Sequence, residues 1–178
     1  MSRNSTRQQI KALTVSAMLC ALGVIILALG SFIEVIDLSV AVIASLLTVY
    51  AVIELRGAYP WLIWLVTSIV AFLLLPLKTP VLFYAMLAGY YPILKEKIEK
   101  KPLLISWALK LCVLTASLIV IYLLFIAFLP EMLAGFEAWY LLLGLYAACT
   151  VVFVLYDVCL TQLITFYLVK LQKRFRIK

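Results

Sequence analysis

Long apolar stretches separated by short basic clusters constrain this chain more than any other feature. Thirteen of its fifteen Lys and Arg residues fall in four clusters. The clusters are Arg3/Arg7/Lys11, Arg56, Lys95/Lys97/Lys100/Lys101 and Lys170/Lys173/Arg174/Arg176/Lys178. Cytoplasmic loops of membrane proteins collect Lys and Arg, and this bias sets the orientation of the chain. The pattern therefore predicts a chain that crosses a bilayer repeatedly, with all four clusters on the cytoplasmic side.

The composition requires lipid as the solvent. Of the 178 residues, 67% are hydrophobic and 13% are charged, whereas a soluble domain is about half apolar and about a quarter charged. Backbone groups in lipid must be satisfied within a helix or a closed barrel, and barrel strands alternate polar and apolar residues. Residues 114–129 do not alternate. The sequence therefore predicts an all-α integral membrane protein in the plasma membrane.

Six membrane spans can be placed in one membrane domain, residues 1–178. A spanning helix needs roughly 20 apolar residues. The predicted spans cover residues 12–33, 38–55, 59–77, 80–94, 103–129 and 139–169. An even number of spans puts both basic termini in the cytoplasm, whereas a five-span alternative would put them on opposite sides.

The fourth span is the shortest, with only about 15 apolar residues, so it must tilt or thin the bilayer to cross. Pro76 and Pro80 should separate it from the third span. The run Tyr90-Tyr91-Pro92 predicts a kink near its inner end. Residues 95–101 could extend it as a cytoplasmic helix, in which Lys95 and Glu99 stand at i,i+4 spacing.

The net charge of +7 does not indicate a nucleic-acid-binding protein. The basic residues flank apolar segments and do not form an interleaved basic and aromatic surface. We therefore expect anionic lipid headgroups as their neighbours.

Two charged residues, Lys110 and Asp157, fall inside predicted spans. Charges within the membrane are costly and face protein or a water-filled cavity. Their depths would differ by roughly 8–9 Å, which a lysine side chain can span. One interpretation is a buried Lys110–Asp157 pair that fixes helix packing, and the other is a proton or substrate site. Lys110 could also extend alone toward the inner surface.

The predicted outer side receives Glu34, Asp37, Lys78, Glu131 and Glu137. Lys78, Glu34 and Asp37 are candidate ligand-binding residues at an outer mouth. Ordinary solvation of loops is the alternative. Lys78 is the basic residue of this set and could meet an anionic group on a ligand.

Motifs for catalysis or cofactors are missing from the sequence. It contains no His, no GxSxG, no HExxH and no paired carboxylates on one helix. Cys20, Cys112, Cys149 and Cys159 lie inside predicted spans without CxxC spacing, which is typical of apolar packing rather than metal binding. We therefore expect no catalytic residue, no metal and no cofactor, and a lipid-modifying enzyme is disfavoured.

The first span contains the run Ser16-Ala17-Met18-Leu19-Cys20-Ala21. Ala17 and Ala21 stand one turn apart, a small-xxx-small spacing that lets two backbones approach closely. Together with the basic leader, the five further spans and the basic end of the last helix, this layout resembles the S components of energy-coupling factor (ECF) transporters. The resemblance covers the whole chain in layout, and Ala17/Ala21 is its local motif.

The resemblance implies a substrate-binding subunit that takes a vitamin or metal ion from outside and topples in the membrane to release it. Ala17 and Ala21 would dock on the coupling helices of a transmembrane T component, and a pair of cytosolic ATPases would supply energy. The absence of His argues against a nickel or cobalt member. The chain is also similar to the MreD family of rod-shape proteins, which would make it a membrane scaffold without a ligand pocket.

Overall fold

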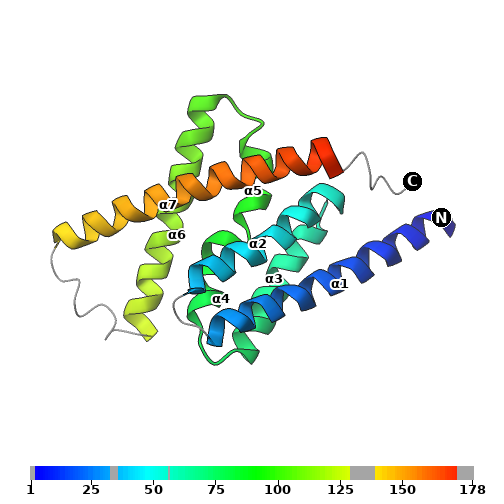
Figure 1. The fold of residues 1–178 in the computed structure, drawn as a ribbon, viewed down its shortest axis with the longest axis horizontal. Helices are drawn as coiled ribbons and strands as arrows, with labels where there is room; N and C mark the ends of the chain where they lie inside the picture. Colours follow the sequence, from blue (N-terminus) through cyan, green and yellow to red (C-terminus); the bar gives the residue numbers. More distant parts are fainter. Residues whose placement is uncertain (1–2, 33–35, 56, 129–138, 172–178) are drawn as a thin grey trace. The chain divides into compact units, whose positions relative to one another are not determined.

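The computed structural model describes residues 3–32, 36–55, 57–128 and 139–171, which are almost entirely helical (Figure 1). The α-helices are α1 (Arg3–Phe32), α2 (Asp37–Glu54), α3 (Tyr59–Leu74), α4 (Thr79–Phe83), α5 (Tyr91–Ile98), α6 (Leu103–Phe128) and α7 (Trp139–Phe166). Two π-helical turns are η2 (Tyr84–Ala88) and η4 (Tyr167–Leu171). Within these residues the predicted all-α fold is confirmed.

Four of the described helices are long and apolar enough to cross a membrane. The candidate spans are Arg7–Phe32, Asp37–Glu54, Leu103–Leu124 and Leu143–Val169. They match the predicted first, second, fifth and sixth spans to within several residues. The third predicted span corresponds to α3, a shorter apolar helix. The structure thus supports a membrane protein with transmembrane helices, while the six-span topology stays a prediction.

The predicted fourth span is a broken helix. Its residues form α4, then η2, and then α5 after a turn at Gly89 and Tyr90. The Gly89 amide donates to the Tyr84 carbonyl at 2.7 Å, which is the i→i+5 bond of a π-helical turn. Pro80 and Pro92 stand in the first turns of α4 and α5, where a missing N–H costs nothing. The kink predicted at residues 90–92 is therefore present, and α5 continues to Ile98.

The chain divides into two compact units, residues 1–110 and 111–178. The first unit holds α1 to α5 and the start of α6, and the second holds the rest of α6, α7 and η4. Each unit is described by itself below. The expected single membrane domain stays a prediction.

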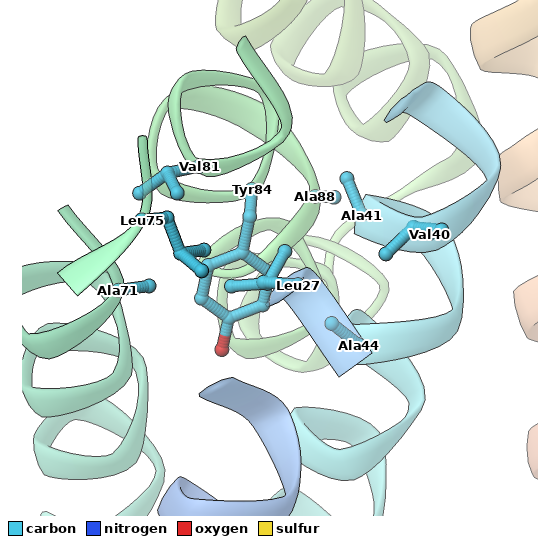
Figure 2. Close-up of a cluster of buried hydrophobic side chains, with 9 residues drawn as sticks. All are labelled: Leu27, Val40, Ala41, Ala44, Ala71, Leu75, Val81, Tyr84 and Ala88. Carbon is cyan, nitrogen blue, oxygen red and sulfur yellow. The ribbon is translucent and has the colours of Figure 1, made fainter. Parts of the chain in front are cut away.

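The core of the first unit is built largely from small side chains. Its buried cluster is Leu27, Val40, Ala41, Ala44, Ala71, Leu75, Val81, Tyr84 and Ala88 (Figure 2). Four of these nine residues are Ala. Between helices in lipid the hydrophobic effect gives little attraction, so close backbone approach and van der Waals contact must hold them together. Small residues allow that approach, and the Tyr84 ring fills the space among them (Figure 2).

A second set of small residues lies on α1, where it packs on α2 and α3. Ser16, Gly23 and Gly30 are buried and stand seven residues apart. A Cβ added at Gly23 would lie 3.0 Å from Cγ2 of Thr67, and one added at Gly30 would lie 3.0 Å from Cγ1 of Val40. A seven-residue repeat keeps one face of a helix against its partner. We call these three residues the α1 seam.

In the second unit, a side-chain hydrogen bond connects α6 and α7. The hydroxyls of Thr115 and Tyr146 lie 3.1 Å apart. Most of the large apolar side chains described on α7 are exposed, as expected of helices that face lipid or another protein.

Candidate functional site

The predicted docking residues Ala17 and Ala21 are exposed on α1. They lie roughly 120° round the helix from the α1 seam. The helix therefore packs on α2 and α3 through one small-residue face and presents a second one outward. Large apolar side chains next to this second face, Met18 and Leu22, are also exposed. The arrangement leaves an exposed strip of small side chains, against which another helix could pack at short backbone distance.

Sequence reasoning missed a similar pair on α7. Gly144 and Ala148 stand four residues apart and are exposed. A Cβ added at Gly144 would meet nothing within 4 Å. The GxxxA spacing could have identified this pair, just as AxxxA identified Ala17 and Ala21. Likewise, the seven-residue spacing of small residues could have identified the α1 seam.

Lys78 lies at the end of α3, and its role in ligand binding stays a prediction. Its Nζ donates to the carbonyls of Phe72 and Leu75 at 2.6 and 2.5 Å and lies 5.0 Å from the centre of the Phe72 ring. The last carbonyls of a helix have no partner within the helix, and a lysine can satisfy them. Lys78 therefore caps the C-terminal end of α3.

Of the other predicted outer residues, the structure describes Asp37. Asp37 is half-buried and is the first residue of α2. Glu34, Glu131 and Glu137 lie outside the described residues. The outer binding mouth thus stays a prediction.

Near the predicted cytoplasmic side, one carboxylate is shared by two lysines. Oε1 of Glu99 lies 3.1 Å from Nζ of Lys95 and 3.3 Å from Nζ of Lys110. The side chains of the two lysines are only 1% and 7% exposed, while that of Glu99 is 41% exposed. The Lys110 ammonium also lies 5.4 Å from the ring of Trp107. The i,i+4 pairing of Lys95 with Glu99 was predicted, whereas the bond from Glu99 to Lys110 was missed.

Asp157, the predicted partner of Lys110, is 4% exposed. The two residues belong to different units, so their pairing stays a prediction. The contact between Glu99 and Lys110 could not be read from sequence, because it depends on the turn that brings the end of α5 beside α6.

Aromatic side chains cluster between the first half of α3 and the turn that precedes α5. Trp64 stands edge-on to both Trp61 and Tyr90, with ring centres 5.7 and 5.9 Å apart. Nε1 of Trp64 donates to the Ala85 carbonyl at 3.1 Å, which satisfies a backbone group of the π-helical turn. The Lys97 ammonium lies 6.0 Å from the Trp61 ring. Trp favours the membrane–water interface, so we expect this corner to lie near the membrane surface.

A small polar group is buried among α1, α2, α3 and η2. The hydroxyls of Thr48 and Tyr84 lie 3.2 Å apart. The Cys20 thiol donates to the Ile63 carbonyl at 3.8 Å. A threonine hydroxyl in a helix often donates to the carbonyl four residues earlier, and for Thr67 that carbonyl is the one of Ile63. Among the described residues, no group of three or more His, Cys, Asp or Glu side chains could hold a metal ion. The contacts of Thr48 and Cys20 therefore join neighbouring helical segments.

Comparisons of this chain with protein-family models, with curated proteins and with solved structures found no match.

Proposed function

We propose that this protein is the substrate-binding membrane subunit of a small-molecule uptake transporter, similar to ECF S components. The observation that supports the proposal most is the placement of Ala17 and Ala21. They are exposed on α1, while the helix is held to its own unit by the α1 seam. A thin face left free by internal packing is suited to docking on a helix of a partner.

The proposal requires partners. The sequence has no phosphate-binding GxxxxGK[ST] loop, so energy would come from a T component and cytosolic ATPases. The substrate would be a vitamin or a related small molecule that enters from outside. Both termini would lie in the cytoplasm of a cell with this protein in its plasma membrane.

The second candidate is a membrane scaffold of the MreD type. Such a scaffold could also bind a partner protein through the exposed face of α1. The two functions differ in whether the protein binds a small-molecule ligand. Native mass spectrometry of the protein purified in mild detergent should detect a retained small molecule for the transporter subunit and none for the scaffold.

The docking face can be tested with two matched pairs of substitutions. Ala17→Leu/Ala21→Leu fills the exposed face of α1, and Gly144→Leu/Ala148→Leu fills the exposed face of α7. Because all four positions are exposed, both variants should melt within a few degrees of the parent. We expect the α1 variant alone to lose co-purification with co-expressed T-component and ATPase subunits.

Three results would contradict the docking proposal. Early melting of the isolated α1 variant would mean that Ala17 and Ala21 support internal packing. Normal melting together with retained partner association would mean that this face does not carry the contact. Loss of association in the α7 variant alone would move the docking face to Gly144 and Ala148.

The predicted orientation of the chain in the membrane can be tested separately. Reporter fusions active only in the cytoplasm, placed at each terminus, should both be active, because the basic clusters predict both ends inside. A reporter active only outside at either end would overturn the six-span topology.

A further inference from the structure

The edge of α5 and the turn after it form a basic surface. Lys97, Lys100 and Lys101 are exposed there, and we call them the α5 basic edge. Directly after them, Leu103 and Leu104 are 74% and 85% exposed. Exposed lysines thus stand beside exposed leucines, an arrangement suited to the boundary between lipid headgroups and acyl chains.

The α5 basic edge is held in place by the opposite face of the helix. Tyr91, Ile93 and Ile98 of α5 are buried in the first unit. The Lys101 amide donates to the Ile98 carbonyl at 3.0 Å, which ties the following turn to the helix end. The lysines are therefore presented from a packed element, and binding there costs less ordering than at a free chain end.

Within this edge, two of the lysines carry the available charge. Lys100 pairs with Glu96 at 3.1 Å. The Lys97 ammonium lies 6.0 Å from the centre of the Trp61 ring. An aromatic ring carries no net charge, so it does not neutralise the ammonium. Lys101 is exposed at the turn. The α5 basic edge therefore carries a net positive charge, and Lys97 places it beside Trp61, a residue type that favours the interface.

We propose that the α5 basic edge, with Trp61, Leu103 and Leu104, binds the phosphate headgroup of an anionic phospholipid in the cytoplasmic leaflet. The ammonium groups of Lys97 and Lys101 attract the phosphate, while the leucines lie against the acyl chains. Trp61 takes the intermediate depth that its ring favours. This inference does not depend on the transporter proposal, because a scaffold would present the same surface to the same leaflet.

Quenching of tryptophan fluorescence by brominated lipid tests the site on the full chain. The protein is reconstituted in phosphatidylcholine vesicles that contain brominated phosphatidylglycerol, and the difference between the parent and Trp61→Phe isolates the signal of Trp61. We expect Trp61 to be quenched at a lower mole fraction of brominated phosphatidylglycerol than of brominated phosphatidylcholine. Lys97→Gln/Lys101→Gln should raise the fraction for half-quenching by roughly tenfold or more.

The matched control is Arg7→Gln/Lys11→Gln, which removes the same charge from exposed positions of α1 on the same predicted side. It should leave the quenching of Trp61 unchanged. If both variants lost the preferential quenching by brominated phosphatidylglycerol equally, the lipid would be attracted by surface charge in general. If Lys97→Gln/Lys101→Gln kept that preference, the edge would bind no headgroup. Either result overturns the site. Quenching by brominated phosphatidylcholine, unchanged in all variants, confirms that each is folded and inserted.

Discussion

The two units of the chain differ in how closely their helices approach one another at glycine. In the first unit, glycines and alanines bring backbones together, and polar groups bond from one helix to another, as from Trp64 to the Ala85 carbonyl. In the second unit, the hydroxyls of Thr150, Thr161 and Thr165 bond to carbonyls four residues earlier on the same helix. A hydroxyl satisfied within its own helix presents less polar surface to its surroundings, and in this unit Thr115 and Tyr146 join α6 to α7. The first unit is therefore built for internal packing, and α7 is built to meet lipid or a partner.

The largest difference between the units should appear when one methyl group is added in each. In Gly89→Ala, the new Cβ would lie 2.6 Å from Cδ1 of Trp64 and 2.8 Å from the Tyr84 carbonyl oxygen. Overpacking of this kind costs about 1–3 kcal/mol, because a backbone atom cannot move aside easily. Unfolding of the purified protein by a denaturing detergent would measure this loss of stability.

The matched control is Gly144→Ala on α7, where nothing lies within 4 Å of the added Cβ. It should be neutral or stabilise by up to about 1 kcal/mol, since Ala favours helix over Gly. Equal destabilisation by the two substitutions would contradict the difference in packing between the units.

The second test concerns the carboxylate shared by Lys95 and Lys110. Glu99→Gln removes the charge that both ammonium groups contact, and we expect it to lower the free energy of unfolding by about 1–2 kcal/mol. The partial exposure of Glu99 reduces the effect below that of a buried ion pair. The change can be followed by the same unfolding titration.

Glu96→Gln supplies the control on the same helix. Its partner Lys100 and Glu96 itself are both exposed, with side-chain exposures of 68% and 53%, and such pairs contribute about 0–1 kcal/mol. If Glu96→Gln destabilised the protein as much as Glu99→Gln, the shared carboxylate would have no special role.

The smallest expected effect compares two threonines. Thr48→Val removes a hydroxyl that bonds to Tyr84 on another segment, and interhelical bonds in membranes contribute about 0.6 kcal/mol on average. Thr150→Val removes a hydroxyl that bonds only to its own helix among the contacts described, so its stability should stay near that of the parent. Thermal unfolding of both variants, measured in parallel, would sharpen the comparison; a larger loss at Thr150 would reverse it.

Much of the helical layout could be predicted because it depends on local chemistry. Four long apolar runs reappear as helices of spanning length, and the prolines at 76 and 80 separate α3 from α4 as expected. The i,i+4 pair of Lys95 and Glu99 was also predicted, since it needs only a helix. The break at residues 84–90 was predicted only in part: a kink followed from Pro92, but the π-helical turn depends on how Tyr84 and Trp64 pack.

The helical character of the chain and its apolar surface follow from the amino-acid sequence, because backbone hydrogen bonding within a helix and apolar composition are local properties of the chain. Which small-residue face of α1 packs internally and which stays exposed depends on the tertiary structure, since both spacings are compatible with close packing. The tertiary structure also decided that Lys78 caps α3 and that Glu99 reaches Lys110. These contacts depend on which helix ends meet, and no local pattern in the sequence encodes that meeting.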